Sequence, residues 1–207
     1  MNNGNKSSIL TVAAKHFADK GFVAASVKEI VTEAGVNISA VAYHFGSKEG
    51  LFTAVFVKKI EPLRQLAIKL MQSNKTCTEK IRELFQIYAV YFLCTEPSLR
   101  VIYADMLSGH FRLPKEATMM VEWRNKIFID TFKRGIKNGE LRKCDLETAA
   151  WCFFGMLMPY ILYEPIGGAG GKLKPYPREF VNRIINSALD IYFNGIAGKS
   201  PKSGKDR

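Results

Sequence analysis

The chain has 207 residues, of which 47% are hydrophobic and 24% charged, which is ordinary for a soluble globular protein with a real core. Its longest apolar run, residues 149–163, is too short to span a bilayer, and its polar start, residues 1–8, lacks the pattern of a secretory leader. The formal net charge of +11 favours a polyanionic partner, although a solvated basic surface would explain it equally well.

The cysteines and histidines give no sign of a metal or a cofactor. Cys77, Cys94, Cys144 and Cys152 are far apart and form no C-x-x-C pair, and the three histidines have no metal-ligand spacing. We therefore expect reduced thiols in a cytoplasmic protein with no membrane association, no metal and no cofactor.

The first predicted helix covers about residues 6–20. Ile9, Ala13 and Phe17 recur at four-residue intervals, so one face of this helix is apolar, and Gly21 is expected to end it. A second helix is predicted to begin at Ser26, because Ser26 and Glu29 have the spacing of a capping box.

Two more helices are expected to follow a tight turn at Gly35. Asn37 is a good N-cap for a short helix over residues 38–44, and Ser47 for a long helix that continues to about residue 71. Two helices joined by a short glycine turn and braced by a preceding helix are typical of the helix-turn-helix motif. Spacing alone also allows an ordinary helical hairpin.

These residues resemble the N-terminal signature of TetR-family repressors. The resemblance covers about residues 9–52 and rests on Ile9-Leu10, Ala13-Ala14, Phe17-Ala18, Gly21-Phe22, Ser26-Val27, Ile30, Ala34-Gly35-Val36 and the run from Tyr43 to Leu51. The chain departs from the family at Ala42, where members usually place Tyr or Asn. Residues 96–100 are similar to one AcrR-like subgroup of the family.

The third helix is the expected DNA-reading element, because a major groove admits one helix. Ile38, Ser39, Ala42 and Tyr43 face away from the inner positions Val41 and Phe45. Ser39 suits a base edge, and Ile38 and Ala42 suit a thymine methyl group. The resemblance implies phosphate or base contacts for Tyr43 and His44. Phosphate contacts are expected from two further residues, Ser26 and Lys48. Any one of these residues could instead be plain surface.

The rest of the chain predicts helices over about residues 76–94, 97–111, 115–138, 145–164 and 178–194. Pro97, Pro114 and Pro177 stand at expected helix starts. The glycine-rich segment 166–171 lacks the P-loop pattern, because Ile166 stands where that pattern needs glycine, so we interpret it as a connection. The tail 198–207 is basic and is expected to be disordered.

Aromatic and methionine side chains crowd these later helices. We interpret part of them as the lining of an apolar ligand pocket, with plain core as the alternative. The candidate pocket residues are Tyr88, Phe92, Met106, His110, Met120, Trp123, Trp151, Phe154 and Met158.

The last two predicted helices are candidates for a subunit contact. The helix over residues 145–164 is apolar almost all round and must be covered on two sides, either by a second subunit or within the chain. By resemblance to the four-helix dimer contact of the TetR family, the candidate interface residues are Phe154, Ile161, Phe180, Ile184, Ile185, Ala188 and Tyr192.

Together these patterns predict an all-α protein. A three-helix head, residues 1–52, would be joined by a long helix to a helical-bundle body, residues 53–197, which binds a ligand and dimerises. The expected function is a homodimeric repressor that binds a palindromic duplex DNA operator and is released by a small lipophilic effector. A redox regulator with Cys94 or Cys152 as its sensor is the alternative. An enzyme is disfavoured, because no nucleophile–base set, metal cluster or cofactor loop is found.

Overall fold

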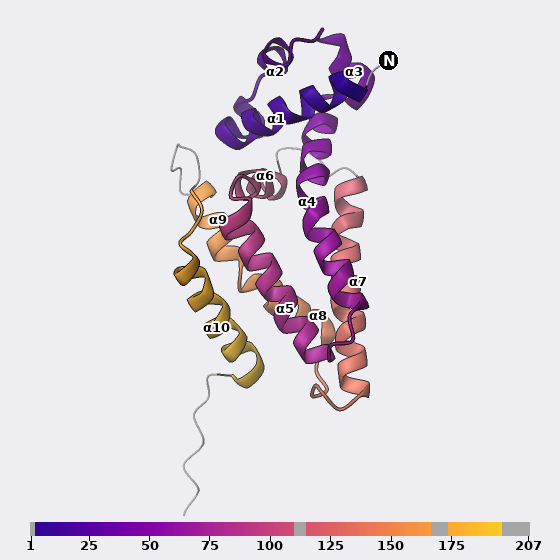
Figure 1. The fold of residues 1–207 in the computed structure, drawn as a ribbon, viewed down its shortest axis with the longest axis vertical. Coiled ribbons are helices and arrows are strands. Elements are labelled where there is room, and N and C mark those ends of the chain that lie inside the picture. The colour runs from indigo at the N-terminus through magenta and orange to yellow at the C-terminus, as the bar shows by residue number, and fades with distance from the viewer. Residues whose placement is uncertain (1–2, 110–114, 167–173, 196–207) are drawn as a thin grey trace, which may run out of the picture.

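A computed structural model describes residues 3–109, 115–166 and 174–195 of the chain, and all regular structure in these residues is helical, as predicted. The chain divides visually into a head of three helices and a body of longer ones (Figure 1). The elements are α1 (Asn3–Ala24), α2 (Val27–Glu33), α3 (Ser39–Phe45), α4 (Lys48–Gln72), α5 (Cys77–Val90), the π-helical turn η1 (Tyr91–Thr95), α6 (Ser98–Leu107), α7 (Lys115–Lys137), α8 (Leu146–Gly155), α9 (Met158–Ile166) and α10 (Arg178–Asn194).

Helix α1 is the brace of the head. Ile9, Ala13 and Phe17 are fully buried along one face, as their spacing predicts. The Phe17 ring packs edge-on against Phe52 of α4, with centroids 4.9 Å apart. The regular helix is interrupted at Gly21, whose φ of 74° and ψ of 175° lie outside the helical region, so the predicted stop at this glycine is confirmed.

Helix α4 joins the head to the body. Its 25 residues correspond to about 37 Å at 1.5 Å per residue. The Ser47 hydroxyl accepts a hydrogen bond from the Gly50 amide at 3.1 Å, which confirms the predicted cap. A Cβ atom at Gly50 would stand 1.9 Å from the Phe45 carbonyl oxygen, so only glycine allows α4 to start this close to the end of α3.

The predicted capping box at the start of α2 is wrong. Ser26 has the extended backbone of an N-cap, but its side chain makes no capping hydrogen bond. Glu29 instead accepts a hydrogen bond from Lys20 of α1 at 2.7 Å, which holds its carboxylate away from the helix start. A complete capping box that we did not predict lies at the start of α5, between Thr76 and Glu79.

In the body, α5 packs against α4, α7 and α10, and α6 lies between the head and the rest of the body, against α1 and α9 (Figure 1). The helix expected over residues 76–94 is α5 continued by η1, and Pro97 and Pro177 precede α6 and α10 as predicted. Pro114, most of the glycine-rich segment and the basic tail lie outside the described residues.

The single helix predicted over residues 145–164 is wrong, because α8 ends at Gly155 and α9 begins at Met158. Pro159 accounts for this break. A proline has no amide hydrogen to donate to the carbonyl four residues earlier, here that of Gly155, and its ring crowds that carbonyl. The chain crosses the break with a tighter turn, in which the Leu157 amide donates to the Phe154 carbonyl at 3.2 Å.

Candidate DNA-binding head and ligand pocket

Helix α3 presents one face to solvent. Tyr43 and Ile38 are exposed over 85% and 56% of their surface, and Ser39 and Ala42 are also exposed. Val41 is buried in the core of the head, so the helix is held from its inner side as the sequence predicts. An exposed helix anchored by its opposite face has the form required to enter a major groove.

The turn between α2 and α3 is built from backbone contacts and one asparagine. Gly35 has a φ of 67°, and the Val36 amide donates to the Val31 carbonyl at 3.0 Å. Asn37 accepts hydrogen bonds at 3.0 Å from both the amide and the hydroxyl of Ser39. Helix α3 begins at Ser39 with Ile38 as its N-cap, so the prediction of Asn37 as the N-cap is wrong by one residue. The bond to Asn37 occupies the hydroxyl proton of Ser39, which leaves the hydroxyl oxygen as an acceptor.

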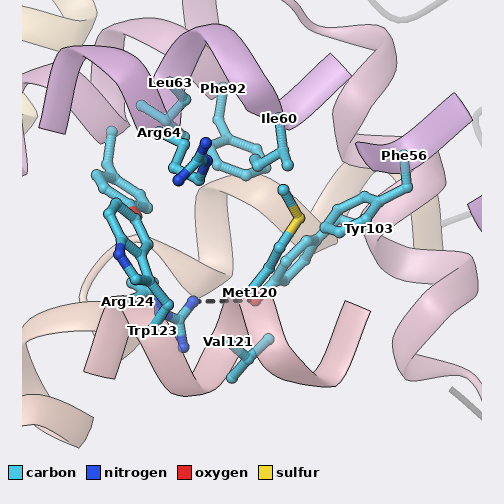
Figure 2. A pocket seen from close by; sticks show the side chains of 11 residues that line it. Phe56, Ile60, Leu63, Arg64, Phe92, Tyr103, Met120, Val121, Trp123 and Arg124 are labelled. Carbon is cyan, nitrogen blue, oxygen red and sulfur yellow. Dashed lines mark hydrogen bonds between the residues drawn. The ribbon is translucent and has the colours of Figure 1, made fainter. Parts of the chain in front are cut away.

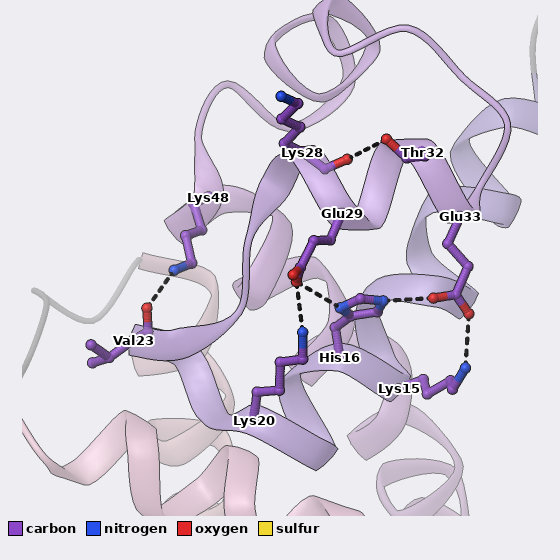
Figure 3. Close-up of polar contacts among 9 residues, drawn as sticks. All are labelled: Lys15, His16, Lys20, Val23, Lys28, Glu29, Thr32, Glu33 and Lys48. Atoms are coloured by element: carbon purple, nitrogen blue, oxygen red, sulfur yellow. Dashed lines mark hydrogen bonds and ion pairs between the residues drawn. The ribbon is translucent and has the colours of Figure 1, made fainter.

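A network of ion pairs ties α2 to α1 (Figure 3). His16 is buried, and its Nε2 lies 2.8 Å from Glu33, which also accepts from Lys15 at 2.8 Å. On the other side of the ring, Nδ1 lies 3.8 Å from Glu29. The hydrogen bonds from Lys15 and His16 hold the pKa of the Glu33 carboxyl below its usual value. Two of the head's lysines, Lys15 and Lys20, are thus neutralised by α2 and are poor candidates for phosphate contacts.

Lys48, a predicted phosphate contact, already has partners within the head. Its ammonium donates to the Val23 carbonyl at 3.1 Å (Figure 3). The same ammonium lies 4.7 Å from the centre of the Phe22 ring. Lys28, which the sequence analysis missed, is exposed on α2, and no described side chain pairs with its ammonium. Ser26 and His44, the other predicted phosphate contacts, are half-buried. Lys28 is thus the better point charge for a phosphate.

The body contains a small cavity, partly open to solvent, between α4, α5, η1, α6 and α7 (Figure 2). Its volume is about 40 Å³, which is room for a few water molecules and not for an organic ligand. Four predicted pocket residues, Tyr88, Phe92, Met120 and Trp123, line it. The lining residues that we did not predict are Phe56, Ile60, Leu63, Arg64, Tyr103, Val121 and Arg124.

Two arginines bring charge to this apolar cavity. Arg64 forms a two-pronged pair with Glu61, with distances of 2.7 and 2.8 Å, and this pair lowers the pKa of the Glu61 carboxyl to about 2. Arg124 donates to the Tyr103 hydroxyl at 3.3 Å (Figure 2). It also donates to the Asn125 side chain, and its guanidinium lies 4.0 Å from the centre of the Phe154 ring. No described carboxylate pairs with Arg124, so one positive charge at the cavity is uncompensated.

The remaining predicted pocket residues lie elsewhere. Trp151 is 75% exposed, so its assignment to the pocket is wrong. Met106 is buried in the core and Met158 is half-buried on α9, and neither lines the cavity. Phe154 does not line the cavity, but it contacts Tyr88 and Arg124, which do. His110 lies outside the described residues.

Most residues assigned to the subunit contact are already covered by their own chain. The buried residues are Phe154, Ile161, Ile184 and Ile185, and the half-buried ones are Phe180, Ala188 and Tyr192. The Tyr192 hydroxyl donates a hydrogen bond to the Ala149 carbonyl of its own chain at 2.8 Å. The prediction therefore chose the inner faces of these helices. The reason is that residues that pack inside a chain and residues that pack between chains are apolar alike.

The outer face of the same helices carries a different apolar stripe. Four exposed residues recur at four-residue intervals: Trp151, Gly155, Pro159 and Tyr163. The exposed fraction is 75% for Trp151 and 78% for Tyr163. We call these four residues the outer stripe. A Cβ atom built at Gly155 meets nothing within 4 Å. Large exposed aromatic side chains in a row are typical of a surface that another molecule covers.

The cysteines named for a redox sensor differ in their surroundings. The Cys94 thiol is half-buried and lies 3.6 Å from the Tyr176 carbonyl oxygen, whereas Cys152 is exposed on α8 beside the outer stripe. All four cysteines are free thiols.

Known proteins share both the head and the whole fold. Residues 9–55 match the family described as "Bacterial regulatory proteins, tetR family". The HTH-type transcriptional regulator YdgC of Bacillus subtilis is 27% identical over 74% of this chain and 77% of its own length. The HTH-type transcriptional repressor KstR2 of Mycolicibacterium smegmatis is 28% identical over 66% of this chain and 67% of its own. The head therefore matches the TetR family, and the chain is similar over 66% to 74% of its length to transcriptional regulators.

A solved TetR-like structure extends the match to the body. The regulator FadR of Bacillus subtilis, in complex with stearoyl-CoA, superimposes with a TM-score of 0.77 over 93% of this chain and all of its own, at 17% identity. This likeness shows the fold of the body, while the head is also matched by sequence. No helix in the described part of the chain is long and apolar enough to cross a membrane.

Proposed function

We propose that this protein is a homodimeric repressor that binds a palindromic operator and is released from it by a small, largely apolar effector. The observation that carries the proposal is the position of α6, which contacts both the cavity and the head. Tyr103 of α6 lines the cavity, and two residues later Asp105 accepts a hydrogen bond at 2.7 Å from the Phe22 amide at the kink of α1. The name of the KstR2 repressor and the stearoyl-CoA bound to FadR support the same type of function.

The size of the cavity explains how binding would act at a distance. An organic molecule cannot enter about 40 Å³ without moving its walls, and α6 is one of those walls. A displacement of α6 would strain the Asp105–Phe22 contact and the packing of α1 on α6. An effector that prefers the displaced arrangement would thereby lower the affinity for DNA.

In the head we assign base contacts to the exposed face of α3, at Ile38, Ser39, Ala42 and Tyr43. Phosphate contacts are assigned to Lys28, together with the predicted residues Ser26, His44 and Lys48. Head residues that neutralise each other, such as Lys15 and Glu33, are excluded from both sets.

The dimer is assigned to the outer stripe and not to the buried residues of α8–α10. A two-fold contact brings the same surface of each subunit together, so the outer stripe, with its two aromatic side chains, would meet its own copy. Gly155 lies in the middle of this row and leaves room for close approach of the partner helix. Ile191 of α10, which is 50% exposed, can extend the contact.

The test is an in vitro selection of random DNA duplexes by the full-length protein, followed by binding measurements with a panel of apolar effectors. We expect a palindrome whose half-sites are about one helical turn, or a multiple of it, apart. A panel member that binds the body should weaken operator binding by about 5- to 150-fold. Selection of no sequence, or of a single unpaired half-site, would refute the dimeric repressor.

A further inference from the structure

The polar groups that face the cavity are all hydrogen-bond donors. The Arg124 guanidinium has no acceptor atom, and the Tyr103 hydroxyl already accepts from Arg124, so its own proton is left to donate. Tyr88 is 92% buried, and no hydrogen bond from a described residue reaches its hydroxyl. Burial raises the pKa of Tyr88, so the hydroxyl keeps its proton. A ligand that completes this site must supply acceptors.

The charge of the cavity points the same way. Arg64 is neutralised by Glu61, but Arg124 has no carboxylate partner among the described residues. Its guanidinium contacts the Phe154 ring, the Tyr103 hydroxyl and the Asn125 side chain, which are all uncharged. A positive charge among uncharged groups favours one bound anion, and a guanidinium matches the two oxygens of a carboxylate. The rest of the lining is aromatic and aliphatic, which suits a hydrocarbon chain or ring.

We propose that the effector is a carboxylic acid with an apolar body, and that Arg124, Tyr103 and Tyr88 hold its carboxylate inside the cavity. This inference rests on the proposed function, because it names the chemical class of the molecule that enters the same cavity. It differs from an acyl thioester of coenzyme A, whose several phosphate charges exceed the single uncompensated charge at Arg124.

The cavity must open for such a molecule, and one lining side chain is suited to move. Met120 of α7 lines the cavity and is only half-buried. An unbranched methionine changes rotamer easily, so it can open space without breaking the packing of α7 on α4. The carboxylate would then displace the few waters for which the closed cavity has room.

The test uses the fluorescence of Trp123, which lines the cavity. Trp151→Phe serves as the background for the fluorescence measurements only, because it removes the other tryptophan, which is exposed. Operator binding is measured with tryptophan at position 151, since this residue belongs to the proposed dimer contact. The probes are butanoate, octanoate, hexadecanoate and phenylacetate, each with its primary alcohol and its coenzyme A thioester. We expect at least one carboxylate to bind about tenfold or more tightly than both its alcohol and its thioester.

Variants assign that preference to the site. Arg124→Gln should remove the advantage of the acid while the alcohol binds as before, and Tyr88→Phe should weaken the acid several-fold. Arg82→Gln is the matched control, because Arg82 also stacks on a phenylalanine ring, with its guanidinium 4.2 Å from the centre of Phe193, but does not line the cavity. Circular dichroism melting confirms that each variant is folded.

The outcomes separate this inference from the proposed function. If no carboxylate binds, if an alcohol or thioester binds as well as its acid, or if Arg124→Gln keeps the preference, the carboxylate site is overturned. A thioester that releases the operator without any acid binding would leave the repressor intact and refute only the carboxylate. An acid that binds through Arg124 without changing operator affinity would support the site and refute effector release.

Discussion

The surface of α3 is where single residues decide recognition. Its outward face could be predicted from sequence, because in a short helix the buried Val41 leaves only the opposite side for Ala42 and Tyr43. The contacts of the Lys48 side chain within the head could not be predicted in this way. Its partners, the Phe22 ring and the Val23 carbonyl, are brought to it by the kink of α1 at Gly21, which is a tertiary effect.

Lys28 and Lys48 should therefore respond differently to substitution. Lys28→Gln removes an unpaired charge, so operator binding should weaken on every sequence, and the slope of log K against log salt should flatten by about 0.9 for each head. The melting temperature should stay unchanged. Lys48→Gln should lower the melting temperature as well, because it removes the contact to Val23. An unchanged salt slope for Lys28→Gln would remove Lys28 from the phosphate contacts.

Ala42 is the sharpest test of base reading, because it is exposed and departs from the usual residue of the family. Ala42→Tyr should change the bases selected at one position of each half-site, with a discrimination of about 1–3 kcal/mol. The measurement is a selection of random duplexes by both proteins. Selection of the same operator by the variant would show that this face of α3 does not read bases.

At the scale of helices, local signals succeeded where both partners lie within one turn. Ser47 caps α4 as predicted, and Asn37 accepts from the Ser39 amide, although α3 has Ile38 and not Asn37 as its N-cap. The capping box of α2 failed because Lys20, on another helix, binds Glu29. The break between α8 and α9 was signalled by Pro159, but the continuous apolar run was given more weight than the proline. Helix existence was thus predictable, while helix ends depended on neighbours in space.

The ion-pair network between α1 and α2 predicts an acid-dependent stability of the head. The pKa of Glu33 is lowered from 4.5 in the folded protein, so its contribution is fully present above pH 4.5 and is lost as the pH falls through the lowered value. Glu33→Gln should reduce the melting temperature at neutral pH, and the deficit should shrink in acid. Lys6→Gln, which removes a charge from the exposed face of α1, is the control. A deficit that stays constant down to pH 3 would mean that the charge of Glu33 is not what stabilises the head.

For the whole molecule, the sequence predicted that the segment that forms α8 and α9 is apolar on more than one side, but not which side faces outward. That choice depends on how the helices pack on α5 and α7, and it places the outer stripe at the surface. The cavity was predicted in the same incomplete way. Its aromatic lining could be predicted from composition. Arg64 and Arg124 could not be predicted, because only the packing of α4 beside α7 brings both arginines to the cavity.

The outer stripe predicts the behaviour of the dimer. Trp151→Glu should convert the protein to a monomer at micromolar concentration without unfolding it, because this side chain is exposed in the single chain and a charge there would be buried only between subunits. Sedimentation velocity measures the mass. Leu66→Glu is the control, since Leu66 is exposed on α4, away from the stripe. A dimer that survives Trp151→Glu would place the contact elsewhere.

Communication between cavity and head can be tested at Asp105. Its carboxylate accepts from the Phe22 amide at 2.7 Å, and a Cβ atom at Gly21 would lie 3.2 Å from the same carboxylate, so the kink of α1 is fitted closely to α6. Asp105→Ala removes the acceptor but leaves the cavity lining and α3 intact. Effector binding to the body should therefore be retained. The ratio of the operator affinity without effector to that with effector should fall toward one. The two affinities, measured with and without the other ligand, form a closed cycle whose coupling must be the same from either side. An unchanged coupling would mean that the signal passes instead through α4, the other element shared by cavity and head.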